Sequence, residues 1–236
     1  MQHPYAAAYK AGWNLAEEFV NMFIGHGGEF FKAGTAEPNI NNTKGVATLN
    51  MLKKLASLSN PDYLTHDSEA IKVEWESGKV ALMTLWASRS GTLLDDEGDA
   101  KITAATKLTG PATVGGGNIP AATLWWDGFT LAKNRSDSDA EATFIALAHA
   151  ASNKKMVADA ADQAVWLVEG FVPGPKSIGV IEAVKMGAKP YPMLPQMGLM
   201  HGALGSEIVE FLQGKESAEQ ALKDVEAAYI SKAKEQ

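Results

Sequence analysis

The chain lacks several features that would place it in a well-defined chemical class. It contains no cysteine, which excludes disulfide frameworks, thiolate metal sites and cysteine nucleophiles. Its only arginines are Arg89 and Arg135, and its formal net charge is −7, so it is poorly suited to binding the phosphate backbone of a nucleic acid. No stretch approaches the roughly 20 consecutive apolar residues that a membrane-spanning helix needs.

The first residues also lack the pattern of an export signal. Met1 to Ala8 contain no basic region followed by a long apolar core. If the protein is exported, we therefore expect this sequence to be a processed or truncated form. The absence of cysteine suits an exported protein but also many cytosolic ones, so it does not decide the compartment.

Motifs for catalysis and for resident metals or cofactors are missing as well. The glycines at 115–117 are followed by Asn118-Ile119-Pro120 rather than by Lys-Ser or Lys-Thr, so we expect a flexible connector and not a phosphate loop. The five histidines show no ligand spacing such as HExxH, and the acidic run at 95–99 lacks the pattern of a calcium loop. We therefore expect no catalytic residue, no metal site and no cofactor.

The remaining composition is that of an ordinary globular protein. The 236 residues are 46% hydrophobic and 21% charged, enough for one large domain or two lobes. Apolar periodicity and capping residues predict helices near 9–24, 43–58, 67–78, 138–151, 154–168, 177–186, 199–212 and 217–232. Short strands are predicted at 80–86, 101–108 and 129–132, the first of them buried. This pattern indicates an α/β fold with too few strands for a complete sheet.

Aromatic and polar residues gather where the chain leaves its predicted strands. Trp86 ends the apolar strand and leads into Ser88 and Arg89, and Trp125-Trp126-Asp127 precedes another predicted strand. Adjacent tryptophans in an extended segment point to opposite sides, so one of the pair faces a cleft or solvent. The apolar C–H face of a sugar ring stacks on an indole, while Asp and Arg bind hydroxyl groups. The residues therefore favour a sugar site, although tryptophan is more often a core residue.

Four regions of the chain, in order, resemble the family 1 extracellular solute-binding proteins, which are maltose-binding-protein-like receptors of ABC importers. The most specific is Trp75–Trp86 (WESGKVALMTLW), which is similar to the family pattern F-x-x-G-K-x-A-M followed by W. The other matching regions are Gly27-Gly28 with 39–58, 125–133 with 140–151, and 195–197 with 217–225.

The resemblance implies a type II periplasmic-binding-protein fold, of which this chain matches only the C-terminal portion. It implies that residues 1–104 and 154–236 form most of the second, helix-rich lobe. Residues 105–153 would then be the crossover and a returning segment of the first lobe. The strands of the N-terminal lobe would be missing from this chain, which accounts for the few predicted strands.

The resemblance also implies a set of ligand-binding positions. Trp13 lies in the early helix from which maltose-type members present a stacking aromatic, and His201 stands where they have a stacking tryptophan. A histidine there suggests a smaller or more polar ligand than a long maltodextrin, although a partly buried structural histidine explains it equally well. The full set of expected ligand-binding residues is Trp86, Ser88, Arg89, Trp126, Asp127, Trp13, His201 and Glu169.

By this resemblance the protein captures a sugar or polyol in a cleft between two lobes and delivers it to the permease subunits of an ABC transporter, without chemistry. Its location would be periplasmic or otherwise extracellular. One alternative is an orphan lobe that folds without ligand and forms a homodimer through unpaired strand edges. A remote alternative is a glycan hydrolase, for which Asp127 and Glu169 are the only carboxylate pair we can nominate.

Overall fold

The computed structural model describes residues 3–95, 98–161, 164–166 and 168–235. Asp96 and Glu97 of the acidic run, and part of the helix expected at 154–168, lie outside these ranges. The α-helices are α1 (Trp13–Gly25), α2 (Thr43–Ala56), α3 (Ser68–Glu76), α4 (Ala87–Ser90), α5 (Ala100–Ala105), α6 (Asp137–Ser152), α7 (Lys154–Asp159), α8 (Ile178–Lys185), α9 (Met197–Leu212) and α10 (Ala218–Ala233). Three short 3-10 helices cover Tyr63–Thr65, Gly91–Leu94 and Pro175–Ser177. Within the described ranges no helix is both long and apolar enough to cross a membrane.

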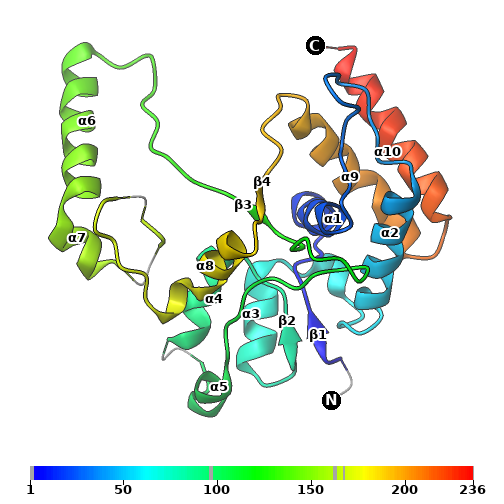
Figure 1. Cartoon of the computed structure of the whole chain (residues 1–236), viewed down its shortest axis with the longest axis horizontal. Coiled ribbons are helices and arrows are strands. Elements are labelled where there is room, and N and C mark those ends of the chain that lie inside the picture. The colour runs from blue at the N-terminus through cyan, green and yellow to red at the C-terminus, as the bar shows by residue number, and fades with distance from the viewer. Residues whose placement is uncertain (1–2, 96–97, 162–163, 167, 236) are drawn as a thin grey trace.

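The main hydrophobic core lies between α1, α2, α9 and α10, which stand together on the right of Figure 1. Each helix supplies an apolar stripe at helical spacing, as the sequence predicts. The side chain of Asn42 caps α2 by accepting hydrogen bonds from the backbone N–H groups of Lys44 and Gly45. Ser217 caps α10 in the same way, and such caps each stabilise a helix by about 1 kcal/mol. Fully buried members of the core include Phe19, Phe23, Leu49, Leu52, Leu204, Ile208, Leu222 and Val225.

The strands are short and form two separate parallel pairs. β1 (Tyr5–Ala6) pairs with β2 (Leu82–Met83), and β3 (Thr123–Leu124) pairs with β4 (Lys189–Pro190). Each pair brings together segments that lie far apart in the sequence. The β3–β4 pair joins the central part of the chain to the link that leads into α9 (Figure 1).

All three predicted strands are wrong in whole or in part. Residues 101–108 begin as helix α5, because the side chain of Asp99 caps it by accepting a hydrogen bond from the Lys101 N–H. Residues 129–132 form no strand: Phe129 is exposed, and no strand among the described residues pairs with this segment. Only 82–83 of the run 80–86 is a strand, and Leu82 is exposed rather than buried. An apolar run does not become a strand unless another strand lies beside it.

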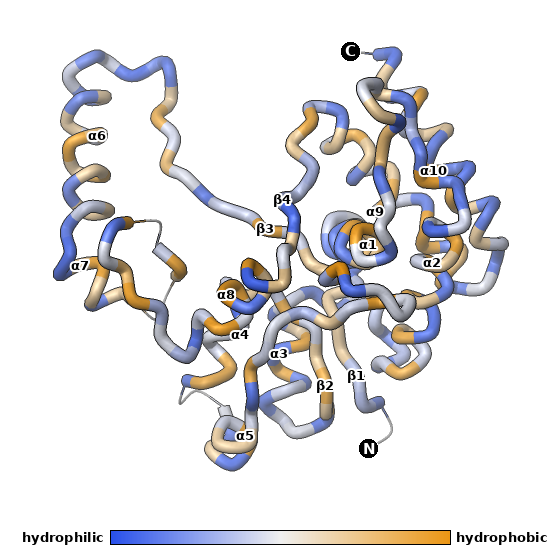
Figure 2. The backbone as a smooth tube through the Cα atoms, in the orientation of Figure 1, coloured by the Kyte–Doolittle hydropathy of each residue, from blue (hydrophilic) through white to orange (hydrophobic). Residues whose placement is uncertain are grey.

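Helices α6 and α7 stand apart from the main core, on the left of Figure 1. No residue of α6 is buried, although the predicted apolar stripe is present and Figure 2 shows apolar positions along the helix. Phe144 and Ile145 are 63% and 59% exposed. α7 ends at Asp159, earlier than the sequence predicts, and Asn153 caps its start. The expected division into residues 1–104 with 154–236 and 105–153 stays a prediction.

A close backbone contact in the core joins the turn before α1 to the middle of α9. The Gly12 N–H donates a 3.0 Å hydrogen bond to the Gly205 carbonyl, and a Cβ at Gly205 would lie only 2.4 Å from the Gly12 carbonyl oxygen. Replacing Gly205 by alanine would force the backbones apart, so we expect a loss of about 1–3 kcal/mol in the free energy of unfolding. Chemical denaturation of the wild type and of Gly205→Ala measures this difference in the free energy of unfolding.

Gly202 provides a matched control in the same helix. It is exposed, and a Cβ there would meet no atom closer than 4.0 Å. Gly202→Ala should therefore stabilise the protein by up to about 1 kcal/mol through helix propensity. Equal effects of the two alanine substitutions would contradict the close contact.

A buried carboxyl group in α1 should make the stability depend on pH. Burial, and to a lesser extent the neighbouring Glu17, raises the pKa of Glu18 from 4.5 to about 8. The folded chain thus retains a proton that the unfolded chain releases. This contribution to stability is fully present below pH 4.5 and is lost as the pH rises through 8, by roughly 1 kcal/mol per pH unit. Thermal unfolding midpoints should therefore fall over this interval.

Glu18→Gln removes this titration, so its unfolding midpoint should fall less steeply than that of the wild type between pH 5 and pH 8. Comparing the two proteins at each pH cancels the contribution of the histidines. Parallel curves would show that Glu18 ionises normally in the folded chain.

Candidate functional site

Five aromatic rings from distant parts of the chain meet beside the start of α1. We call them the aromatic cluster: Trp13, Trp86, Trp125, Tyr191 and His201. Trp13 lies at its centre, with ring centroids 5.4 Å from Trp86, 5.9 Å from Trp125 and 5.0 Å from His201. Trp125 lies 4.2 Å from Tyr191, which lies 5.9 Å from His201.

Local backbone features place each ring. Trp13 is the first residue of α1, directly after Gly12, whose φ of 99° suits a glycine. Trp86 is the residue before α4. Trp125 and Tyr191 immediately follow the paired strands β3 and β4, and the Tyr191 N–H donates to the Leu124 carbonyl at 3.1 Å. Strand pairing therefore sets these two rings beside each other.

The aromatic cluster is open to solvent on one side. Trp13 and Trp125 are each 50% exposed, whereas Trp86 and Tyr191 are partly buried and His201 is buried. The planes of the two exposed indoles, Trp13 and Trp125, are inclined to each other at 59°. The exposed indoles thus offer apolar surface in more than one plane, which suits a compact ligand with apolar C–H faces.

His201 uses both ring nitrogens inside the protein. Its Nε2 lies 3.0 Å from the Trp13 carbonyl oxygen, which can only accept, so Nε2 carries the proton. Nδ1 is then an acceptor and receives the Tyr191 hydroxyl proton at 2.9 Å. Burial lowers the pKa of His201, which keeps the ring neutral. His201 therefore joins the start of α1 to the link before α9, and it has no ring nitrogen left for a ligand.

A polar network lies behind the cluster. The Trp125 Nε1–H lies 3.2 Å from Oε1 of Glu17 and 2.9 Å from Oγ1 of Thr123. Thr123 Oγ1 in turn lies 2.9 Å from Glu17 Oε1 and 2.8 Å from Asn21 Oδ1. Glu17 is only 2% exposed, and its burial raises its pKa to about 7. Burial, with a smaller effect of Glu17, also raises the pKa of Tyr191.

Two of the other expected ligand residues lie on α4. Arg89 forms an ion pair with Glu69 at the start of α3, and both side chains are about half exposed or more. Such a surface pair contributes at most about 1 kcal/mol. Ser88 is exposed next to it. A ligand role for Arg89 stays a prediction, and it would require the guanidinium to leave Glu69.

The remaining expected residues are exposed. Trp126 and Asp127 follow Trp125, and the structure describes no ring contact for Trp126. Glu169 is exposed in the segment after α7, a helix that Figure 1 places well away from α1.

Of the expected ligand residues, Trp13, Trp86 and His201 are thus brought together by ring contacts. Glu17 and Tyr191 were not expected. Tyr191 has a proline on each side, and prolines hold a segment extended. This pattern in the sequence could have indicated Tyr191 as a site residue.

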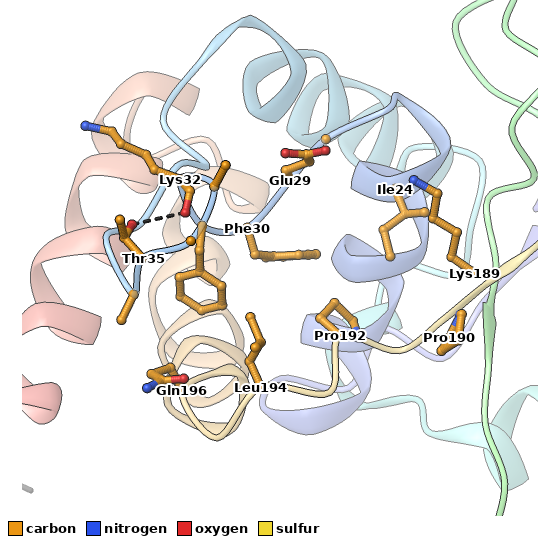
Figure 3. A pocket seen from close by; sticks show the side chains of 15 residues that line it. Ile24, Glu29, Phe30, Lys32, Thr35, Lys189, Pro190, Pro192, Leu194 and Gln196 are labelled. Carbon is orange, nitrogen blue, oxygen red and sulfur yellow. Dashed lines mark hydrogen bonds between the residues drawn. The ribbon is translucent and has the colours of Figure 1, made fainter.

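A separate hollow of about 650 Å³ lies between the loop after α1 and the link of residues 189–196. Figure 3 shows Phe30, Pro192 and Leu194 around its centre. Pro190 and Pro192 line the hollow while Tyr191, between them, joins the aromatic cluster, as alternation along an extended segment requires. One face of the link therefore borders the hollow and the other borders the cluster.

No known protein-family model and no curated protein sequence matches this chain. Several solved structures do. An ABC transporter solute-binding protein from Agrobacterium radiobacter in complex with ribitol matches with a TM-score of 0.70 at 17% identity, over 96% of this chain and 58% of that one. Maltose-bound MalE3 from T. maritima has a TM-score of 0.74 at 17% identity, over 97% of this chain and 60% of its own.

A solute-binding protein from Agrobacterium vitis with bound D-mannitol also matches, with a TM-score of 0.72 at 15% identity, over 99% of this chain and 61% of that one. The chain thus spans about three fifths of the length of these structures. At such low identity the similarity concerns the fold. The chain is a helix-rich α/β structure that has the fold of part of the type II periplasmic binding proteins that serve ABC transporters.

Proposed function

We propose that this chain binds a sugar or polyol on the aromatic cluster, as part of the substrate-binding component of an ABC transporter. The observation that carries the proposal is the open set of rings around Trp13, within a fold shared with proteins solved with ribitol, maltose and D-mannitol. Such a protein would work in the periplasm and pass its ligand to membrane permease subunits.

The chemistry of the cluster favours a neutral, hydroxylated ligand. Trp13 and Trp125 offer half of their surface to solvent, so a ligand that covers them removes apolar area from water. The buried polar group behind them is the carboxyl of Glu17, which would repel an anion when ionised. Because the chain spans only about three fifths of its structural neighbours, we expect weak binding, measurable at millimolar ligand.

The hydrolase alternative finds little support in the geometry. Asp127 and Glu169 are both exposed, and they belong to segments on either side of α6 and α7. Among the described residues, the buried carboxyl groups with raised pKa values are Glu17 and Glu18, which are consecutive in α1. Cleavage of a glycosidic bond requires two carboxyl groups flanking the substrate. We therefore propose binding without catalysis.

Thermal unfolding with ribitol, D-mannitol or maltose at millimolar concentration tests the proposal. A ligand present at about 100 times its dissociation constant stabilises the folded chain by roughly 2.7 kcal/mol. For a chain of this size, that ratio of ligand to dissociation constant raises the midpoint by about 5–10 °C, and ligand at only a few times its dissociation constant raises it by about 2–4 °C. Trp13→Ala and Trp125→Ala should each remove most of this rise, because they delete the exposed stacking surface.

Val73→Ala serves as the control, because Val73 is an exposed apolar residue on α3 outside the cluster. It should leave the ligand-induced rise unchanged. The binding proposal fails if none of these ligands or related sugars shifts the midpoint. The cluster assignment fails if the tryptophan variants, still folded by circular dichroism, keep the full rise.

A second candidate function, self-association of a lobe that binds no ligand, is favoured by α6. This helix buries none of its residues and exposes Phe144 and Ile145 side by side. Each parallel pair also contains only two strands, so each strand has one edge that no other described strand covers. We expect sedimentation velocity to show a concentration-dependent dimer if this candidate is correct, and Phe144→Asp with Ile145→Asp to weaken it at least tenfold. A monomer at all concentrations would exclude it.

A further inference from the structure

Glu17 connects α1 to the tryptophan that follows β3. It lies one helical turn after Trp13, on the same face of α1. Its Oε1 faces both the indole N–H of Trp125 and the hydroxyl of Thr123. Its Oε2 is buried and has no hydrogen-bond partner among the described residues. One carboxyl oxygen therefore has hydrogen-bond partners, and the other has none among the described residues. The group lies directly behind the exposed indole of Trp125.

The number of hydrogens available for bonding around Thr123 bears on the protonation state of Glu17. The hydroxyl has a single hydrogen, yet Oγ1 lies within 2.9 Å of Glu17 Oε1 and 2.8 Å of Asn21 Oδ1. One hydrogen cannot serve both oxygens. The second hydrogen comes either from a protonated Glu17 or from the Asn21 amide after rotation of its end group. A protonated Glu17 also avoids leaving a charged, unpartnered oxygen in the interior.

Among the described residues, the groups around Glu17 supply no positive charge that would keep it ionised. Glu18 follows it on α1 with a pKa near 8, and is protonated at neutral pH. Tyr191, on the link, has a raised pKa, and His201, on α9, has a lowered one, so both are neutral. The raised pKa of Glu17 has burial as its main cause, and the hydrogen bonds of Thr123, Trp125 and Asn21 lower it in part.

We propose that Glu17 is a positioning residue of the aromatic cluster, which holds the Trp125 indole against Tyr191 and couples ligand binding to the uptake of a proton. The coupling deepens the proposed function and rests on it. A ligand that covers Trp13 and Trp125 removes water from the region around Glu17. Further desolvation favours the uncharged carboxyl group, so ligand affinity should decrease as the pH rises through neutrality.

The positioning role can be tested without ligand. Tryptophan fluorescence of the full chain should show a single transition near pH 7, because ionisation of Glu17 changes the charge next to the Trp125 indole. Glu17→Gln keeps the shape and a hydrogen-bonding oxygen but cannot ionise, so the transition should disappear. Trp125→Phe should remove it too, whereas Glu18→Gln, the matched control on the same helix, should keep it.

A second readout needs no variant of uncertain folding. The side-chain carboxyl carbon of Glu17, followed by ¹³C NMR in the wild-type chain, should titrate near pH 7. A Glu17 carboxyl that titrates near pH 4.5, or a fluorescence transition that survives in Glu17→Gln, would overturn the proposal.

The coupling is tested with whichever of ribitol, D-mannitol and maltose binds. Wild-type affinity should fall at least threefold from pH 6 to pH 8, and the affinity of Glu17→Gln should stay constant. The same pH dependence in both proteins would overturn the coupling. If neither these three ligands nor related sugars bind, the proposed function and the coupling fail together, while the fluorescence and NMR titrations still decide the positioning role.

Discussion

The arrangement of the site depends on the contact between the start of α1 and α9. The missing side chain of Gly205 lets the Gly12 backbone approach within hydrogen-bonding distance, and His201, one turn earlier on α9, donates to the carbonyl of Trp13. These two contacts fix the position and direction of the first residue of α1. Trp13 is also the ring that the other members of the aromatic cluster surround, so an error at this contact would displace the whole cluster.

The second constraint comes from β3 and β4. Two-residue strands contribute little energy by themselves. Their pairing matters because Trp125 and Tyr191 each follow directly, and the Tyr191 N–H extends the pairing by one residue. The link that carries Tyr191 is anchored further by His201 on one face and borders the hollow on the other. The site is thus assembled from five places in the chain: the start of α1, the residue before α4, the residues that follow β3 and β4, and α9.

The helices were largely predictable and the strands were not. Capping residues such as Asn42 and Ser217, followed by apolar stripes, mark α2 and α10 in the sequence because both signals are local. Strands depend on distant partners, which explains why 101–108 proved to begin with a capped helix and why 129–132 has no strand. In the site, Trp13, Trp86 and His201 could be suggested from motifs, but their ring contacts could not. Glu17 gave no signal, because a glutamate on a helix is usually exposed, and its burial depends on tertiary packing that also brings Thr123 and Trp125 within hydrogen-bonding distance.

The geometry of the tryptophans has an optical consequence. Trp86 and Trp125 lie 5.4 and 5.9 Å from Trp13, at fixed and non-parallel angles of 87° and 59°. Indole transition dipoles held this close and in a chiral arrangement couple to one another, which splits their absorption bands and produces a paired circular-dichroism signal of opposite signs. The paired circular-dichroism signal of the folded chain therefore reports the relative placement of α1, α4 and β3, without any attached label.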